Sequence, residues 1–399
     1  MFTKRRVRCP VTRFARTVLF VAIAFRGVGT SQTNSNLVLL HPARSISLKA
    51  CGWEPERSIG HHAGFVPLRI AFDHQGNLWA GYSQKSIGLT PRSAPETSFE
   101  YEIVAISGSP AQCAVRLSRP TTANSPAAVL ISSKDGLLVV ANDELHLVDK
   151  IGFKDRATFE LLRPSDHARY RVLQSPARKL LVVVADGFTK ADSSYTWLDP
   201  DSLEVRNSCT YPPAPDNFHY IGLRSFADDG RFVELDYGWS RFGYSLVAGQ
   251  FCSPKLEIPP EHVQPRAAIL LDSGTAYFVE DPRREKPWRI LVKDKSEATA
   301  FDLIGDSNKE TIGESNVAVS EDERRLALSI DTPAGGSQML DISSHVASRR
   351  VDIYDTKTWA RVAYIKLLTP GVASLSFSPD GKTLAIQTED LVQFYDGIP

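Results

Sequence analysis

Short runs of alternating apolar and polar residues dominate this chain, and long apolar stripes at helical spacing are absent from its sequence. The clearest example is SLSFSPDGKTLAI (374–386), in which Leu375 and Phe377 alternate with serines. The turn signal Ser-Pro-Asp-Gly follows at 378–381, and the apolar alternation then resumes. Proline pre-sets φ for the first turn position and glycine supplies a positive φ, so this segment predicts a β-hairpin.

The same pattern recurs along the chain. Two units lack the turn glycine, because Arg178 and Glu323 stand where it would be. Counting 374–386, the sequence predicts seven hairpins, spaced by roughly 40 to 60 residues. The other six are at 68–82, 127–143, 170–186, 220–236, 266–281 and 315–331.

A second kind of hairpin is predicted between these units. VDIYDTKTWARVAYIKL (351–367) and YTWLDPDSLEVRNSCTY (195–211) each contain two alternating runs around a turn that opens with Asp. An Asp at that position accepts backbone hydrogen bonds, and Ser or Thr three residues later can close the turn. Four strands per repeat of this length are typical of a β-propeller, so we expect an all-β, seven-bladed β-propeller, with six or eight blades left open.

The motifs also resemble known repeats. The 374–386 and 351–367 segments look like the WD40-like and YVTN-type propeller repeats of secreted bacterial proteins, and IAFDHQGNLWAGY (70–82) resembles the blade motif of two-component-regulator propellers. Gly-His and Trp-Asp pairs, which mark eukaryotic-type WD40 repeats, are absent from the blade ends. The resemblance therefore implies the fold and leaves the activity open, since propellers have many roles.

The last unit lacks a fourth strand in the sequence. It contains three predicted strands, at 372–377, 382–387 and 390–395. A bare sheet edge is a liability, and propellers commonly close by borrowing a strand from the other end of the chain. We expect residues 36–50, with alternation from Ile46 through Leu48, to supply the outer strand of the last blade.

The first 31 residues predict a secretory signal peptide. A basic segment is followed by a short apolar run, TVLFVAIAF (17–25), and then by small residues. The run is too short to span a bilayer, which takes about 20 residues. We expect residues 32–399 to form a single propeller domain that is exported to the periplasm or outside the cell. The alternatives are an uncleaved anchor or a start codon assigned too far upstream.

Removal of residues 1–31 changes the charge. They contain seven of the 46 basic residues and none of the 46 acidic ones, which leaves 46 − 7 = 39 basic residues and a net charge of 39 − 46 = −7. This balance argues against a nucleic acid or an anionic membrane as partner.

Four cysteines remain in that mature chain: Cys51, Cys113, Cys209 and Cys252. No C-x-x-C pair suggests zinc, and an even number in an oxidising compartment suggests disulfides. We favour Cys51–Cys113 and Cys209–Cys252, which the propeller places in neighbouring positions. Free buried thiols are the alternative.

No catalytic, cofactor-binding or metal-binding residues are predicted. His61-His62, with His74 further on, lacks a carboxylate at useful spacing. The segment 238–242 lacks the second glycine of a nucleophile elbow, and Gly335-Gly336-Ser337 lacks the Lys of a phosphate loop. Acidic pairs such as Asp228-Asp229 lie in hairpin turns, where they serve turn chemistry.

We therefore expect a monomeric binding or scaffold module without a cofactor. Its partner would be a protein or a component of the cell envelope, engaged at the channel mouth or at long loops such as 332–350. Trp53, Trp239 and Tyr237 could line a groove there. The alternative is a propeller-type hydrolase, such as a lactonase with a metal in the central channel.

Overall fold

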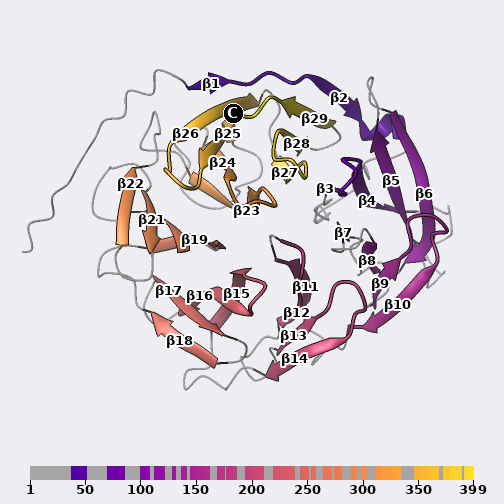
Figure 1. Ribbon diagram of the computed structural model, residues 1–399, viewed down its shortest axis with the longest axis horizontal. Helices are drawn as coiled ribbons and strands as arrows, with labels where there is room; N and C mark the ends of the chain where they lie inside the picture. The colour runs from indigo at the N-terminus through magenta and orange to yellow at the C-terminus, as the bar shows by residue number, and fades with distance from the viewer. Residues whose placement is uncertain are drawn as a thin grey trace, which may run out of the picture. The chain divides into compact units, whose positions relative to one another are not determined.

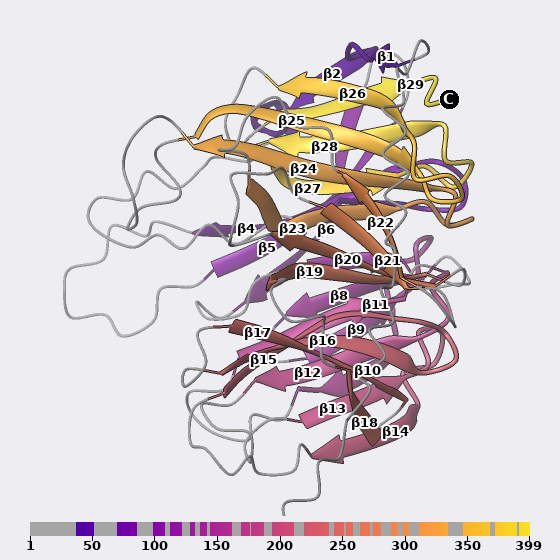
Figure 2. The same ribbon diagram turned by 90° about the vertical axis from the view of Figure 1, so that its left-hand side faces the viewer.

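The computed structural model consists almost wholly of β-strands in the residues that it describes (Figures 1 and 2). No helix among these residues is long and apolar enough to cross a membrane. The description covers residues 37–51, 70–85, 99–107, 112–121, 128–131, 136–141, 144–161, 169–175, 177–186, 194–210, 219–238, 243–250, 253–257, 264–271, 274–280, 289–293, 298–302, 311–333, 346–367, 372–388 and 391–399.

The first three sheets are antiparallel meanders of four strands each, so every strand pairs with the next one along the chain. Their strands are β3 (Ile70–Phe72), β4 (Leu78–Lys85), β5 (Phe99–Ser107) and β6 (Gln112–Thr121); β7 (Ala128–Ile131), β8 (Leu137–Ala141), β9 (Glu144–Val148) and β10 (Asp155–Glu160); and β11 (Arg169–Gln174), β12 (Leu181–Asp186), β13 (Ser194–Leu198) and β14 (Val205–Thr210).

Two further four-stranded meanders follow, and then two sheets that each gain a strand from the N-terminal segment. These strands are β15 (His219–Phe226), β16 (Arg231–Gly238), β17 (Gly243–Gln250) and β18 (Ser253–Glu257); β19 (Gln264–Leu271), β20 (Gly274–Glu280), β21 (Arg289–Lys293) and β22 (Ala298–Asp302); β23 (Thr311–Val319), β24 (Arg325–Pro333), β25 (Val346–Asp355) and β26 (Arg361–Leu367); and β27 (Val372–Phe377), β28 (Thr383–Thr388) and β29 (Leu391–Asp396).

Two short N-terminal strands complete the last two sheets. The strand β2 (Arg44–Ser47) pairs antiparallel with β29 and is the edge strand of the β2–β29–β28–β27 sheet. The sequence did not indicate β1 (Val38–Leu39), which pairs parallel with β26 and makes that sheet five-stranded. The expected extended alternation ends early, because the 3₁₀ helix η1 (Leu48–Cys51) begins directly after β2.

All seven predicted hairpins between first and second strands are confirmed as antiparallel pairs. The three strands expected in the last unit are found within one residue of their predicted bounds. The local turn chemistry was therefore a reliable guide, since each turn fixes the register of its own hairpin.

The core lies in the seams between sheets rather than within one central layer. Side chains of β28 and β29 pack on β3, β4 and β5 in one cluster, and side chains of β24 to β26 pack on β27 to β29 in another. First strands contact one another across the seams, including β23 with β27, β27 with β3 and β3 with β7. Ser374 and Ser376 on β27 strengthen one seam, because their hydroxyl oxygens accept the backbone N–H groups of Ile70 and Phe72.

Candidate functional site

Where the structure describes the connections between first and second strands and between third and fourth strands, both kinds lie at the same end of the strands. In a four-stranded antiparallel meander these two connections must share an edge, while the connection between second and third strands leaves at the opposite one. We call the end of the strands that carries these two connections the turn edge and the opposite end the loop edge. Both names refer to ends of strands and not to edge strands. Polar side chains on the turn edge form the best-defined constellation among the described residues.

Three first turns of the turn edge share one hydrogen-bonding pattern that starts from a serine. The hydroxyl oxygens of Ser320 and Ser378 each accept the backbone N–H of the residue five positions later at 2.9 Å, and Ser175 does so at 3.1 Å. These serines are almost fully buried. The serine thus closes the turn from inside, which explains why SPDG-like segments mark the hairpins.

The serine hydroxyl donates its proton to a carboxylate, and one turn borrows that carboxylate from a neighbour. Ser320 donates to Asp322 and Ser378 to Asp380, each at 2.6 Å. In the turn of Ser175 the equivalent position is an alanine, and the hydroxyl instead donates to Asp228 on the turn between β15 and β16 at 2.5 Å. Asp228 therefore links two neighbouring sheets.

The fourth position of these turns requires a left-handed backbone whether or not glycine is present. Gly381 has φ of 68°, whereas Glu323 and Arg178 at equivalent positions have φ of 55° and 61°. L-residues adopt this region at a cost of roughly 1–2 kcal/mol. The absence of glycine at 178 therefore changed the strain in the turn and not its shape.

A second turn type joins third to fourth strands and is built on Asp149, Asp199 and Asp355. Each carboxylate accepts two backbone N–H groups, from the residues two and three positions later. The fifth residue has positive φ in all three turns and inserts an apolar side chain into a seam between sheets: Phe153, Leu203 and Trp359. The sequence had indicated two of these turns, and the one at Asp149 had been missed because no Ser or Thr closes it.

These hydrogen bonds keep the turn carboxylates ionised. The backbone N–H groups of Gly152 and Ile151 lower the pKa of Asp149. Burial pushes the pKa of Asp355 upward, but hydrogen bonds from Thr358 and the charge of Arg325 outweigh it, so the pKa is lowered. In Asp199 burial is likewise outweighed, chiefly by the hydrogen bond from Arg206, and the pKa is lowered.

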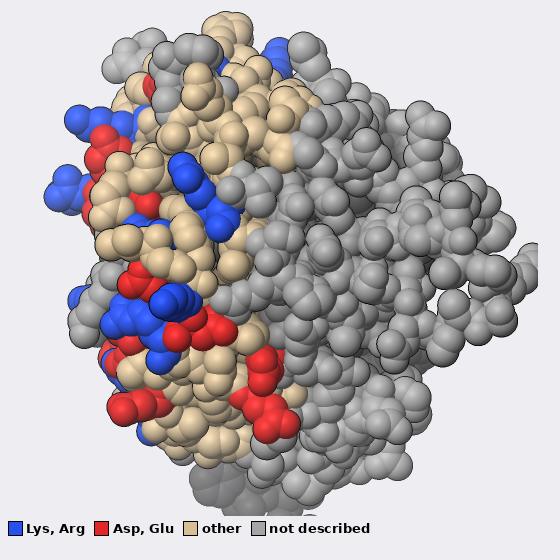
Figure 3. Space-filling model, turned by 90° about the vertical axis from the view of Figure 1, so that its right-hand side faces the viewer, with Lys and Arg blue, Asp and Glu red and all other residues tan. Residues whose placement is uncertain are grey.

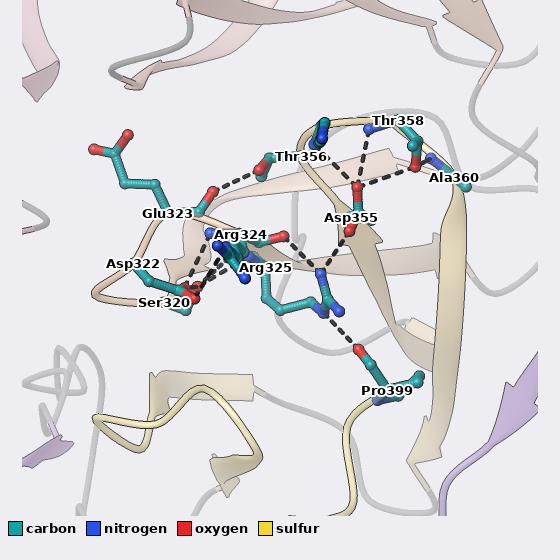
Figure 4. Close-up of polar contacts among 11 residues, drawn as sticks. Ser320, Asp322, Glu323, Arg324, Arg325, Asp355, Thr356, Thr358, Ala360 and Pro399 are labelled. Carbon is teal, nitrogen blue, oxygen red and sulfur yellow. Dashed lines mark hydrogen bonds and ion pairs between the residues drawn. The ribbon is translucent and has the colours of Figure 1, made fainter.

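The two turn types meet around Arg325 (Figure 4). Its guanidinium donates to the Asp355 carboxylate and to the main-chain oxygen of Pro399, each at 2.6 Å. The Thr356 hydroxyl donates to the carbonyl of Glu323 at 2.5 Å. The ends of three strands, β24, β25 and β29, are thereby held by one set of polar contacts.

A buried carboxylate holds a comparable junction between the β3–β6 and β7–β10 sheets. Asp73 is only 1% exposed and accepts hydrogen bonds from the Trp79 indole at 2.9 Å and from Lys150 of the next sheet at 3.1 Å. Burial raises its pKa, but the bonds from Trp79, Asn77 and Lys150 outweigh that effect, so the pKa is lowered. The equivalent of the turn serine is thus replaced here by an ionised aspartate.

Asp352 is a second buried carboxylate and lies within the β23–β26 sheet, away from the turns. It is fully buried, with Arg350 at 2.8 Å and Arg361 at 3.4 Å. Burial raises its pKa above the ordinary carboxyl value, and the two guanidinium groups oppose that rise. Such a buried, doubly paired group stabilises packing geometry and has no opening toward a substrate in the described contacts.

The described turn edge is electrically mixed. Figure 3 shows basic and acidic side chains interspersed on the described part of one side. Some of the turn residues form ion pairs, such as Arg231 with Asp229 at 2.7 Å. No group of three or more His, Cys, Asp or Glu side chains suited to a metal ion occurs among the residues that the structure describes. The polar chemistry of this edge is therefore structural: its carboxylates fix turns and join sheets.

The sequence matches no known family model, and no curated protein is similar to it. Among solved structures, 850 chains are similar to this one. One is a chain in the crystal structure of a mitotic checkpoint complex, with a TM-score of 0.52 and 10% sequence identity, covering 100% of this chain and 97% of that one. Another is the C-terminal WD40 domain of Sif2, with a TM-score of 0.49 and 10% identity, covering 91% of this chain and 99% of that one. The fold is that of a WD40-like β-propeller.

In this propeller the predicted cysteine pair Cys51 and Cys113 lies at disulfide distance, with the two Cα atoms 5.6 Å apart. Cys51 is on η1 and Cys113 is on β6. Cys209, on β14, is also disulfide-bonded. Its expected partner, Cys252, is outside the described residues, so the Cys209–Cys252 pairing stays a prediction.

Several other candidate residues also fall outside the described part of the propeller, namely His61, His62, Trp53, Trp239 and the loop with Gly335. Tyr237 lies on β16, and its side chain is not described. His74 lies in the turn after β3 and faces Glu321 of another first turn, with 3.6 Å between Nδ1 and the carboxylate. It thus brings two first turns together.

The sequence pattern does not indicate two structural residues of the propeller, Asp352 and Lys150. Asp352 lies in a strand of alternating apolar and polar residues, where a polar residue is expected to be exposed. Its burial becomes understandable only when its ion pairs with Arg350 and Arg361 are known. Lys150 bonds Asp73 and Gln75, which are about 75 residues away in the sequence. A pairing between separate sheets leaves no local signal.

Proposed function

We propose that this protein is an exported binding module, a seven-bladed propeller that β2 closes by completing the last blade. The closing strand is supported by the pairing of β2 with β29 and the seven sheets among the described residues. Export is supported by the leader-like segment 1–31 and by the Cys51–Cys113 pair, since disulfides persist in oxidising compartments.

The observation that carries the proposal is the difference between the two edges of the blades. On the turn edge the described connections are short, and their carboxylates are engaged in turn and inter-sheet contacts. Several connections that start from the loop edge are longer in sequence, such as residues 86–98 between β4 and β5 and residues 334–345 between β24 and β25, although those at 142–143 and 389–390 have two residues. Binding residues are commonly carried on loops held by a rigid scaffold.

The partner that we propose is a protein or another envelope component, engaged by the loop edge. The turn edge has interspersed charges rather than one sign, which gives little steering toward a polyanion. Asp149, Asp199 and Asp355 are already bonded to backbone N–H groups, so their oxygens have reduced capacity for a ligand.

The test compares two matched variants of the exported protein. One replaces residues 334–345 with a two-residue Asn-Gly turn, which suits a hairpin. The other, Lys357→Ala with Arg324→Ala, removes exposed charge from the turn edge. Cross-linking in intact cells, followed by binding measurements with each purified partner, should show loss of binding by at least tenfold in the loop variant alone.

Two outcomes would contradict the proposal. One is a partner whose binding depends on Lys357 and Arg324 and survives the loop replacement. The other is turnover of a lactone by the purified protein with a divalent metal, lost on chelation, which would favour the hydrolase. Circular dichroism and the thermal midpoint of both variants serve as the folding control.

A further inference from the structure

The N-terminal segment Val38–Cys51, which we call the clasp, contacts three consecutive sheets. Its strand β1 pairs with β26, its strand β2 pairs with β29, and Cys51 meets Cys113 on β6 (Figure 1, indigo). Two further backbone bonds hold the region between the strands, from Leu40 to Tyr364 at 3.0 Å and from Ala43 to Phe394 at 2.8 Å. The clasp therefore does more than complete one blade.

Apolar side chains of the clasp fill both seams that it crosses. Leu40, 8% exposed, packs in the cluster between the β23–β26 and β27–β29 strands. Ile46 and Leu48, 9% and 0% exposed, pack with Phe72 and Phe394 in the next seam. The Arg44 guanidinium lies 4.3 Å from the centre of the Phe394 ring.

The paired lengths of the clasp are short. Strand β1 has two residues and β2 has four, and both lie at sheet edges. Val38 and Leu39 are 40% and 38% exposed, so β1 contributes little burial. Short edge strands open locally more readily than central ones. A covalent link at the end of such a segment therefore strongly affects the fraction of time for which the segment is paired with β26 and β29.

We propose that the Cys51–Cys113 bridge is a redox latch on the clasp. When the bridge is oxidised, the clasp stays on all three sheets. When the bridge is reduced, the clasp leaves and returns reversibly, and the outer edges of β26 and β29 become accessible. The latch requires the clasp contacts and is independent of the partner and face put forward under the proposed function.

The reaction is a thiol–disulfide exchange with an external dithiol. A thiolate of the dithiol attacks one sulfur of the bridge and releases the other cysteine as a thiolate, which takes up a proton. The second thiol then displaces the remaining cysteine, leaving two cysteine thiols and one oxidised dithiol. Cys113 is the accessible side of the bridge, because it is only partly buried while Cys51 is 7% exposed.

The size of the effect follows from the chain between Cys51 and the start of β3 at Ile70, because β3 to β6 stay in their sheet when the clasp opens. Closing a loop of about 18 residues removes enough chain entropy to favour the attached clasp by about 10²-fold. The reduced clasp should thus open roughly a hundred times more often, while sheets remote from it are unaffected.

Amide hydrogen exchange with mass spectrometry on the full exported protein tests this. Reduction with dithiothreitol, with alkylation to identify which cysteines are free, should speed exchange in peptides covering 38–47, 361–367 and 391–396. Peptides covering β12 and β13 should keep their protection. Cys51→Ser with Cys113→Ser should show the fast pattern without reductant and no further change with it.

The control variant Cys209→Ser removes the disulfide of Cys209, and the clasp of this variant should still respond to dithiothreitol. The latch is overturned if alkylation shows that Cys51 and Cys113 are free and amide exchange in 38–47 is nevertheless unchanged. Uniform loss of protection in all sheets also overturns it, because the bridge would then hold the whole fold. If the double serine variant does not fold, the wild-type reduction series decides between these results.

Discussion

The left-handed residue of the first turns offers a sharp test of the turn chemistry. Glu323 adopts φ of 55° at the position that Gly381 occupies in the neighbouring turn with φ of 68°. We predict that Glu323→Gly makes the protein more stable than Glu323→Ala. The alanine variant removes the side chain and keeps the strain, so the comparison isolates the backbone.

The magnitude combines two opposing effects. A non-glycine residue in the left-handed region costs roughly 1–2 kcal/mol. Glycine gives back roughly 0.4–1 kcal/mol, because it is more flexible in the unfolded chain. Glu323→Gly should therefore exceed Glu323→Ala by about 0.5–1 kcal/mol in unfolding free energy. The bond from Thr356 goes to the backbone carbonyl of residue 323 and is kept in both variants.

Urea unfolding followed by tryptophan fluorescence and circular dichroism measures this difference, provided that the m value is unchanged. Gly381→Ala is the reverse test and should destabilise by a similar amount. A methyl group there would lie 3.5 Å from the Ser320 Cβ, an ordinary contact, so the backbone is the cause. Ala360→Gly is the control at a position without positive φ, and it should be destabilising.

Equal stability of the glycine and alanine variants at 323, within about 0.2 kcal/mol of each other on the usual scale of such effects, would refute the reasoning. The turn would then be relaxing to another shape when its glycine is missing. A destabilising Glu323→Gly together with a neutral Gly381→Ala would show that the two turns are not equivalent.

Three further predictions concern the junctions between sheets. Deleting residues 36–50 should lower the thermal midpoint strongly, since Leu40, Ile46 and Leu48 each lose burial that contributes about 2 kcal/mol; an unchanged midpoint would rule out strand borrowing. Asp73→Ala should destabilise by about 3 kcal/mol, as expected when a buried ion pair loses one partner, whereas loss below about 1 kcal/mol would mean that Lys150 is solvated. The pKa of turn carboxylates such as Asp355 is lowered in the folded protein. The resulting stability is present above the pKa of the unfolded chain, about 3.9, and is lost as the pH falls through the lower pKa of the folded protein. The contribution of these groups to the urea midpoint should therefore be constant above about pH 5 and should fall below about pH 4.

The sequence predicted those parts of the fold that depend on neighbouring residues. The hairpins at 374–386 and 351–367 carry their own turn signals, and both were found where the pattern indicated. The unit at 170–186 was also correct without its glycine, because Ser175 supplies the closing hydrogen bonds. Turn chemistry, alternation and strand length all act within about ten residues of chain, which is the range that such patterns report.

Contacts between distant segments were predicted less well. Strand β1 has only two residues and pairs with a strand more than 300 residues later, so no periodicity reveals it. Asp352 reads as an exposed residue until Arg350 and Arg361 are placed beside it. The Cys51–Cys113 pair could be proposed because the propeller repeat itself brings the end of the N-terminal segment close to the first blade.

The long-range pairing of the clasp determines the order in which parts of the fold can form. The bond between Ile70 and Ser374 joins residues 304 positions apart, and β2 must wait for β29 in the same way. At a synthesis rate of roughly 5–20 residues per second, about 15–60 s pass before the last strands exist. During that interval the first sheet has no neighbour on one side, and its segment 36–51 has no edge to join. The Cys51–Cys113 bridge, by contrast, joins this segment to β6 of the first sheet, so its formation does not depend on the strands that are made last.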